Sequence, residues 1–345
     1  RICRREPVVL VGAPLCRRAV ERWSFAYLSA QMDEAWAGKA HAVPRRSGRF
    51  QPVYGPGLRE GSVSPASFGA FAARSADPAS PSAHYLQMPL VGGEAVAAWG
   101  RDPYGPELRA DVRDFGWPWL EGLLDRAGLG GLAGLRHVQL WIGRGGALTP
   151  CHHDKLENVY VQVRGCKRFL LIPPEETFRV YPYPMEHPLD AWSMVDFEAP
   201  CEKRFPGFAH IRGALEVVLE PGDVLYLPKY WWHHVSQGLG EENVSVNFWC
   251  DAPPPASEGE ATGFPRLAAE FARLPPRCRA LRALRVAEDF SCGAERAGAL
   301  PEGMGYGRFL TELAASLDAD WPPETPSAVR LLAEDLRRLL AALLG

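Results

Sequence analysis

Between residues 137 and 250 the chain is a series of short segments in which apolar and polar residues alternate, separated by turn residues such as Gly and Pro. Alternation with a period of two predicts strands, and several short strands joined by turns are typical of antiparallel sandwiches and barrels. Nothing in this stretch resembles alternating βαβ units. The predicted strands cover residues 137–142, 158–163, 167–172, 215–219, 223–227, 231–236 and 244–249.

The region before these strands, residues 1–136, mixes helix, strand and loop. A short buried strand is predicted at 8–11, a helix at 17–31 and another at 117–127, each from the spacing of its apolar residues. Residues 41–82 are rich in Gly, Pro, Ser and Arg. We expect them to form a long connection of the kind that is usually functional or mobile.

The region after the strands, residues 251–345, has no strand pattern. It opens on Asp251-Ala-Pro-Pro-Pro255, a plausible boundary, and its last helix begins near Ser327, a suitable N-cap. The leucine-rich stretch Leu331–Leu344 is more apolar than a lightly docked helix needs, which favours a homodimer through these helices over packing on the chain's own domain. Earlier helical stretches lie near 265–274, 277–289 and 306–317.

Composition excludes several classes of protein. The chain has 345 residues, 38 basic and 41 acidic side chains and a net charge of −3, so no global basic field points to nucleic-acid binding. No apolar run reaches the roughly 20 residues that a bilayer crossing needs, and we expect no membrane association. The eight Cys form no C-x-x-C pair, which fits a reduced protein of the cytoplasm or nucleus.

The feature that carries chemistry is Thr149-Pro-Cys-His-His-Asp154, an H-x-D motif in an extended context. Side chains two apart on a strand share a face, so His152 and Asp154 can reach one ion while His153 points away. A remote histidine, His233 or His234, can supply a third ligand. Two imidazoles and one carboxylate leave positions of a metal open, as in non-haem Fe(II) oxygenases, whereas structural zinc sites are usually closed by four ligands.

The alternative is that an H-x-D triplet occurs by chance and each histidine is structural. The all-β surroundings and Lys167, on the next predicted strand, favour the metal site. A buried lysine would pair with a second carboxylate of a co-substrate, although it could also be a surface residue beside Arg168. Thr149, Asn158 and Asn247 are polar at strand positions where apolar residues are expected.

At these residues the sequence resembles the JmjC-type 2-oxoglutarate oxygenases, and among them the asparaginyl hydroxylases of the factor-inhibiting-HIF type. The resemblance covers roughly residues 6–255, and the C-terminal third shares only its helical character. The family fold is mostly β: a double-stranded β-helix, or jelly roll, with flanking helices and a C-terminal helical region that usually forms a homodimer. The matching stretches are 149–154, 158–167, Pro173-Pro174, Tyr181-Pro-Tyr-Pro184, His187-Pro188, Val195-Asp-Phe197, Arg204-Phe-Pro206, 221–226, 230–234 and 246–249. A weaker similarity reaches back to Glu6-Pro-Val-Val-Leu10 and Tyr85-Leu-Gln87.

The resemblance implies a role for individual residues. His152, Asp154 and His233 fall on the iron ligands, which selects His233 over His234, and Lys167 falls on the partner of the distal carboxylate of 2-oxoglutarate. Further residues implied near the co-substrate are the hydroxyl donors Thr149 and Tyr85, the amides Asn158 and Asn247, and the aromatic wall Trp249. The implied organisation is a flank at 1–136, a JmjC core at 137–250 and a dimerisation region at 251–345.

One departure affects the expected substrate. The resembled hydroxylases have an Arg-Gln pair that contacts the target amide, where this chain has Ala191 and Trp192. Ala191 cannot hydrogen-bond through its side chain and Trp192 is only a donor, so amide selectivity is weakened, although Gln87 can still supply a contact. Trp192 could favour a longer or more apolar target side chain.

The predicted function is therefore an Fe(II)- and 2-oxoglutarate-dependent protein hydroxylase that uses O2 and yields a hydroxylated side chain, succinate and CO2. Its catalytic residues are His152, Asp154 and His233, and its partner is a protein or peptide substrate. The alternatives are a lysyl or arginyl hydroxylase or a lysine demethylase of the same fold, and a catalytically silent jelly-roll binding module.

Overall fold

The computed structural model describes residues 2, 5–32, 38–44, 62–77, 82–91, 104–144, 146–183, 189, 191–238 and 242–251, with short helical pieces between 271 and 341. The chain divides into two compact units, the first made of residues 1–181 and 192–253 and the second of 182–191 and 254–345. In the second unit the described residues near 282–287 and 333–338 are helical. The predicted homodimer rests on residues that lie largely outside the described ones.

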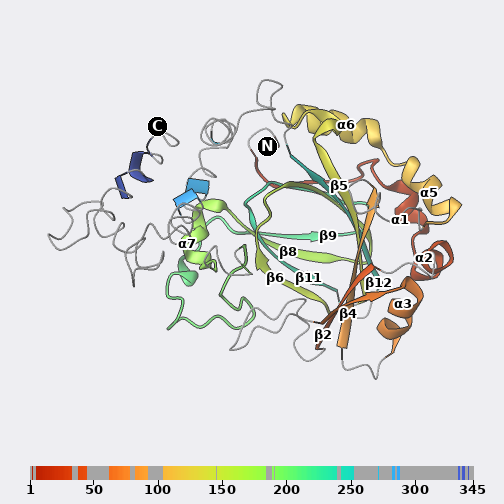
Figure 1. Ribbon diagram of the computed structural model, residues 1–345, viewed down its shortest axis with the longest axis horizontal. Helices are drawn as coiled ribbons and strands as arrows, with labels where there is room; N and C mark the ends of the chain where they lie inside the picture. The colour runs from red at the N-terminus through yellow and green to blue at the C-terminus, as the bar shows by residue number, and fades with distance from the viewer. Residues whose placement is uncertain are drawn as a thin grey trace. The chain divides into compact units, whose positions relative to one another are not determined.

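Two antiparallel sheets form the centre of the first unit (Figure 1). The larger has the strand order β1-β10-β7-β12-β5-β4-β2-β3, and the smaller has the order β6-β11-β8-β9. The strands are β1 Val8–Leu10, β2 Gly38–Pro44, β3 Ser62–Ala66, β4 Ser82–Val91, β5 Leu135–Arg144, β6 Leu148–His152, β7 Glu157–Arg164, β8 Lys167–Ile172, β9 Leu215–Leu219, β10 Val224–Leu227, β11 Trp232–Gln237 and β12 Glu242–Cys250. Strands β5 to β12 are shared between the two sheets in the manner of a jelly roll, which confirms the predicted fold class.

The alternation of residues along each strand of the larger sheet separates an apolar face from a polar face. On β12, Val244, Val246 and Phe248 belong to the main core, whereas Ser245 and Asn247 occupy the other face. Strand β7 is buried at every position but its last because both of its faces are covered. The polar face, which we call the inner face, is the one that Lys167 of the smaller sheet reaches through its contact with Ser245.

Helices cover the apolar face of the larger sheet, on the right of Figure 1. They are α1 Arg17–Arg22, α2 Phe25–Gln31, α3 Phe68–Ala76, α5 Pro106–Arg113 and α6 Trp117–Arg126; the shorter helices are η2 Gly131–Gly134, η3 Pro174–Glu176, α7 Thr177–Val180 and η4 Phe208–His210. Large fully buried side chains such as Trp23, Phe68 and Phe71 pack there against Leu86 and Phe248. This apolar layer packs on one face of the larger sheet, so the polar side chains lie on the opposite, inner face.

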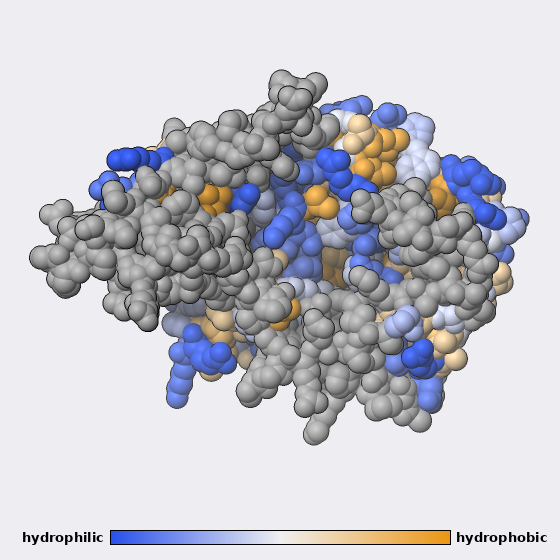
Figure 2. Space-filling model, in the orientation of Figure 1, coloured by the Kyte–Doolittle hydropathy of each residue, from blue (hydrophilic) through white to orange (hydrophobic). Residues whose placement is uncertain are grey.

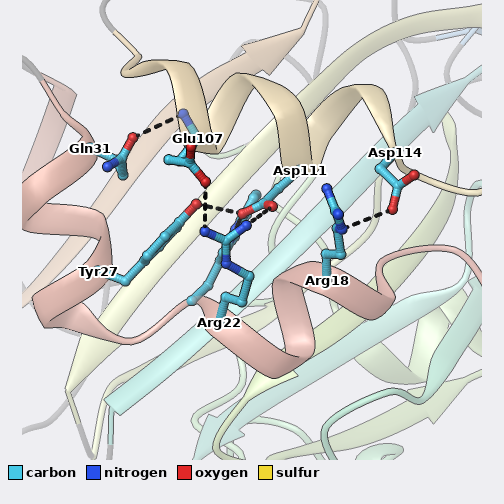
Figure 3. Close-up of polar contacts among 8 residues, drawn as sticks. Arg18, Arg22, Tyr27, Gln31, Glu107, Asp111 and Asp114 are labelled. Atoms are coloured by element: carbon cyan, nitrogen blue, oxygen red, sulfur yellow. Dashed lines mark hydrogen bonds and ion pairs between the residues drawn. The ribbon is translucent and has the colours of Figure 1, made fainter.

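A buried carboxylate joins the helices to one another (Figure 3). Asp111 on α5 is fully buried and accepts hydrogen bonds from Arg22 (2.7 Å), Trp23 Nε1 (3.0 Å) and Tyr27 Oη (2.5 Å). Arg22 also pairs with Glu107 one turn earlier on α5. A buried charge with this many donors is a structural anchor, because the loss of its partners would leave it uncompensated.

Residues 41–82, expected to be one long connection, instead contain most of β2, all of β3 and α3. β2 pairs with both β3 and β4, so it extends the larger sheet. The sequence Gly38–Pro44 has several small residues and no alternation of large apolar side chains, so its pattern did not predict a strand. A signal did exist for α3, since Ser67 caps it by accepting from the backbone of Ala70 and Phe68 and Phe71 share one face.

Other expected elements differ in their bounds. The helix predicted at 17–31 is interrupted at Trp23–Ser24, because Ser24 adopts an extended backbone and caps α2 through the backbone N–H of Tyr27. The strand predicted at 8–11 ends at Leu10, and Val11 is 82% exposed. The helices predicted at 265–274, 277–289 and 306–317 lie largely outside the described residues.

Few large apolar side chains are exposed among the described residues. The exposed large apolar side chains among them are Val11, Leu215 and Val218. On the face seen in Figure 2, hydrophilic residues gather over the middle of the view, with small apolar patches among them. None of the described helices is both long enough and apolar enough to cross a membrane.

Candidate metal centre

Two histidines face each other across neighbouring strands of the smaller sheet. His152 is the last residue of β6, His233 is the second residue of β11, and the antiparallel register places them directly opposite. Their ring centroids are 4.1 Å apart. The register shifts immediately after His233, between His233 and Val235. Bulges of this kind re-aim side chains and are frequent beside functional sites.

Each of these imidazoles is held by its own strand through one ring nitrogen. His152 Nδ1 lies 2.9 Å from the carbonyl of Pro150, and His233 Nδ1 lies 2.9 Å from the carbonyl of Trp231. A carbonyl can only accept, so both Nδ1 atoms carry the proton and both Nε2 atoms keep a lone pair. A backbone carbonyl in this position fixes the tautomer of a metal-binding histidine.

Asp154 completes the group although it lies two residues beyond the end of β6. Its backbone carbonyl accepts a hydrogen bond of 2.8 Å from the N–H of Tyr230, just before β11. Its Oδ1 lies 4.0 Å from His152 Nε2 and its Oδ2 lies 3.4 Å from His233 Nε2. Oδ2 is buried and makes no hydrogen bond. The ligand atoms of the three residues all lie within 4.8 Å of one another, a spacing that one metal ion can bridge.

The electrostatics keep these groups in the forms that bind a metal. Burial and the neighbouring His233 lower the pKa of His152 to about 4, so its imidazole is neutral at physiological pH. Burial alone would raise the pKa of Asp154, but the nearby His233 and His152 outweigh it and lower that pKa. Two imidazoles and one carboxylate are the donor set of the facial triad of non-haem Fe(II) sites.

The two remaining histidines of the motifs lie elsewhere. The His153 ring packs edge-on against Trp232, with centroids 4.7 Å apart. His234 Nε2 lies 3.0 Å from Glu198 Oε1, and its ring stacks on Phe197. The structure therefore brings His233, and not His234, to Asp154.

Lys167 is a buried cation with no ion-pair partner among the described residues. It is 3% exposed, and its Nζ donates to Tyr85 Oη (2.9 Å) and Ser245 Oγ (3.0 Å). It also lies over the ring of Tyr160, 5.2 Å from the centroid. Burial lowers the pKa of Lys167 to about 7. An ammonium group in such a place is expensive to bury unless an anion joins it, which makes Lys167 a candidate partner for an acidic ligand.

Gly143 makes the close packing near Lys167 possible. A Cβ atom at Gly143 would lie 2.7 Å from Gln237 Oε1 and 2.8 Å from Tyr85 Cδ2. Gln237 is opposite Lys167 in the register of β11 and β8. A larger residue at 143 would push these side chains away from Lys167.

The other predicted residues line the inner face of the larger sheet or flank the triad. Asn247 Nδ2 donates to Asn158 Oδ1 (3.4 Å), and the Trp249 ring lies 5.9 Å from that of His137. Gln87 Nε2 donates to Gln139 Oε1 (2.8 Å). Thr149 is on β6 opposite Val235, and the structure shows no contact between it and Lys167.

Trp192 lies beside the triad in an unexpected way. Its indole stacks on His152 at 4.4 Å with an angle of 18° between the rings, and the two residues form a β-bridge. Trp192 therefore supports a metal-ligand candidate directly. Ala191 belongs to the second compact unit, and its contact with substrate stays a prediction.

Sequence reasoning missed Ser245, Tyr160 and Gln139. Ser245 is two residues before Asn247, and Tyr160 is two residues after Asn158, so strand parity places both on the inner face. Gln139 is a polar residue in an otherwise apolar run, which was a signal of the same kind.

Comparison with known proteins agrees with this geometry. The sequence profile described as the cupin-like domain matches residues 1–255. The chain belongs to the cupin-like domain family. Strand order, facing sheets and the His-Asp-His group are thus those of a cupin-like domain with a candidate metal centre.

Individual relatives of this cupin-like domain carry different names. HSPB1-associated protein 1 of Rattus norvegicus is 39% identical over 141 residues, 40% of this chain and 26% of that protein. Lysine-specific demethylase JMJ32 of Arabidopsis thaliana is 37% identical over 142 residues, 33% of this chain and 41% of that protein. Bifunctional peptidase and (3S)-lysyl hydroxylase JMJD7 of Homo sapiens is 33% identical over 134 residues, 33% of this chain and 41% of that protein.

These matches span less than half of each of these relatives. They confirm the resemblance to JmjC-type proteins. The finer resemblance to asparaginyl hydroxylases stays a prediction, because two of these relatives are named for lysine chemistry.

Proposed function

We propose that this chain is an Fe(II)- and 2-oxoglutarate-dependent oxygenase that acts on a side chain of a protein or peptide. The observation that carries the proposal is the presence of an open His152–Asp154–His233 group and a buried lysine, Lys167, in the same smaller sheet. A metal with only three protein ligands retains positions for a co-substrate and O2. A buried lysine supplies the charge that a dicarboxylate needs at its far end.

The residues present fit the metal. The two Nε2 atoms and a carboxylate oxygen of Asp154 lie within 4.8 Å of one another, and Asp154 Oδ2 accepts no hydrogen bond from the described residues. Fe(II) held there would couple oxidative decarboxylation of 2-oxoglutarate by O2 to oxygenation of the bound side chain, with release of succinate and CO2. The protein's own contribution is to hold the ligands in one protonation state, to bind and orient the reactants and to keep water out.

For the co-substrate, Lys167 would donate to the distal carboxylate while Tyr85 and Ser245 hold the ammonium group in position. Burial raises the pKa of Tyr85, which keeps it a neutral hydroxyl that can donate to a carboxylate oxygen. Thr149 would add a second hydroxyl. Asn158, Asn247 and Trp249 would form the wall beside the co-substrate.

The class of the target side chain is open to two candidates. The sequence resemblance favours an asparaginyl-hydroxylase-like target, whereas the names of two relatives favour lysine as the target of hydroxylation or demethylation. Mass spectrometry separates these outcomes, since hydroxylation adds one oxygen and demethylation removes a methyl group. A silent binding module would give neither product.

The test is succinate formation by the purified chain with Fe(II), 2-oxoglutarate, O2 and a peptide library. We expect succinate that depends on iron, and a loss of at least about 100-fold in Asp154→Ala, because removal of a ligand carboxylate destroys the site. Asp114→Ala is the matched control, since Asp114 is an exposed residue paired with Arg18. Absence of iron-dependent succinate from the wild-type protein would contradict the proposal.

A further inference from the structure

The turn between β10 and β11, residues 228–231, contacts two of the three metal-ligand candidates. The N–H of Tyr230 donates to the backbone carbonyl of Asp154 (2.8 Å). The carbonyl of Trp231 lies 2.9 Å from Nδ1 of His233, whose ring it orients. The position of this turn, which we call the 228–231 turn, therefore affects both Asp154 and His233.

Arg5, more than 220 residues earlier in the sequence, holds the 228–231 turn through its backbone and through its side chain. Its carbonyl accepts a hydrogen bond of 3.1 Å from Trp231 Nε1. Its Nη1 lies 3.1 Å from Glu157 Oε1, and the other oxygen of that carboxylate, Oε2, accepts from the backbone N–H of Lys229 (3.3 Å). The first contact with the turn is direct, and the second passes through Glu157.

Glu157 is a buried carboxylate that the proposed reaction does not use. It is the first residue of β7 and is 1% exposed. The hydroxyl of Tyr226 donates to Glu157 Oε2 (2.8 Å) and accepts from Arg5 Nη1 (2.9 Å). The ammonium group of Lys229 pairs instead with Asp251 (3.2 Å). A buried carboxylate that loses its cation is left uncompensated, so removal of Arg5 disturbs the acceptor that holds the backbone of Lys229.

Both ends of this connection have a backbone conformation that is unusual for residues other than glycine. Arg5 has a φ of +54° and Tyr230 a φ of +68°, and they are two of the three such residues in the part of the chain that the structure describes. A left-handed conformation of this kind persists only where surrounding contacts fix it, and such residues gather at functional sites. The contacts of Arg5 with the 228–231 turn supply part of this restraint at Tyr230.

We propose that Arg5 is a positioning residue for the metal centre, and that it acts by holding the 228–231 turn through Trp231 and Glu157. This inference rests on the proposed function, since it names a further residue that serves the same site. Ligands that are already held in place lose less freedom when a metal binds, so a loosened turn should lower the metal affinity.

The test is calorimetric titration of the metal-free chain with Co(II), with Arg5→Met as the main variant. Arg22→Met is the matched control, because Arg22 likewise pairs with a fully buried carboxylate, Asp111, but on helix α5. Arg5→Lys, which keeps a cation beside Glu157, tests for rescue. Thermal unfolding of each variant measures its stability separately.

A second measurement needs no metal. Hydrogen exchange of the Tyr230 N–H in the metal-free protein, read by mass spectrometry, reports how firmly the 228–231 turn is held. Trp231→Phe removes the hydrogen bond to the Arg5 carbonyl and keeps an aromatic ring. If Arg5→Met does not fold, Trp231→Phe decides by the same two measurements.

We expect Arg5→Met to lower the Co(II) affinity about tenfold, because outer partners of metal ligands typically contribute at least that much. The Tyr230 N–H should exchange several-fold faster in this variant, and Arg5→Lys should lie closer to the wild type in both measurements. Trp231→Phe should change both in the same direction as Arg5→Met. Arg22→Met should lower the temperature of unfolding and leave the Co(II) affinity and the Tyr230 exchange unchanged.

Unchanged Co(II) affinity in Arg5→Met, or an equal loss of affinity in Arg22→Met, overturns the inference. Failure of the proposed function is a different result: the wild type then binds Co(II) but forms no iron-dependent succinate. In that case the comparison of affinities still decides whether Arg5 positions the ligands.

Discussion

The protonation state of Lys167 makes binding of 2-oxoglutarate dependent on pH in a direction that the structure fixes. Burial lowers the pKa of Lys167 to about 7 in the free protein. A bound carboxylate favours the charged ammonium form and therefore raises this pKa. The complex then holds more protons than the free protein above pH 7, so binding takes up a proton there, and affinity falls as the pH rises from 7 toward the pKa of the complex.

The number of protons taken up on binding follows from that pKa. At pH 8 only about one free molecule in ten carries the ammonium form, so binding takes up roughly 0.9 proton, and affinity falls about tenfold for each further pH unit. At pH 6 about nine molecules in ten are already charged, so uptake is only about 0.1 proton and the affinity no longer changes with pH.

The assay is titration calorimetry of the metal-loaded protein with 2-oxoglutarate, in buffers that differ in ionisation enthalpy, at pH 6 and pH 8. Lys167→Arg stays charged at both values, so it should bind without proton uptake. Lys167→Met should lose most of the affinity, whereas Lys203→Met, at an exposed site, should behave as wild type. Equal proton uptake at both pH values in the wild type would refute the reasoning.

Three further predictions concern the metal and the anchor of the helices. Trp192→Ala should weaken metal binding about tenfold, since outer partners of ligating histidines typically contribute that much; a metal titration with unchanged affinity would show that the stack on His152 is incidental. Removal of metal by a chelator should lower the temperature of unfolding and its return should restore it, measured by calorimetry; no shift means that no metal is held by the folded state. Asp111→Ala should lower the free energy of unfolding, measured in urea, by about 3–5 kcal/mol, because Arg22 and its neighbours lose their buried partner. Arg18→Ala, which removes an exposed ion pair, should lower it by at most about 1 kcal/mol. Similar losses in the two variants would contradict the role of Asp111 as an anchor.

Much of the fold could be predicted from the sequence where one physical rule dominates. Strands β8 and β9 have the predicted bounds, because alternation along Lys167–Ile172 and Leu215–Leu219 ends at clear turn residues. By contrast, β2 has small residues and an extended partner far along the chain, so nothing local marks it as a strand. Strands of this kind depend on tertiary pairing rather than on local pattern.

The candidate site shows the same limit. Strand parity predicted that His152 and Asp154 share one face of a strand. In the structure β6 ends at His152, and Asp154 is held instead by a backbone hydrogen bond from Tyr230, which residue spacing does not predict. Strand parity alone left the choice between His233 and His234 open; the resemblance selected His233, and the register of β11 against β6 places it opposite His152. Strand parity does place Ser245 and Gln139 on the inner face, but it does not show which side chains they meet there, because that depends on the pairing between strands.

The most direct test of the central claim is an anaerobic titration of the purified chain, first with Fe(II) and then with 2-oxoglutarate, in the wild type and in Asp154→Ala. One iron per chain is expected, together with 2-oxoglutarate binding that requires the iron and is lost in the variant. Equal binding of 2-oxoglutarate with and without iron, or equal iron affinity in Asp154→Ala, would contradict the account.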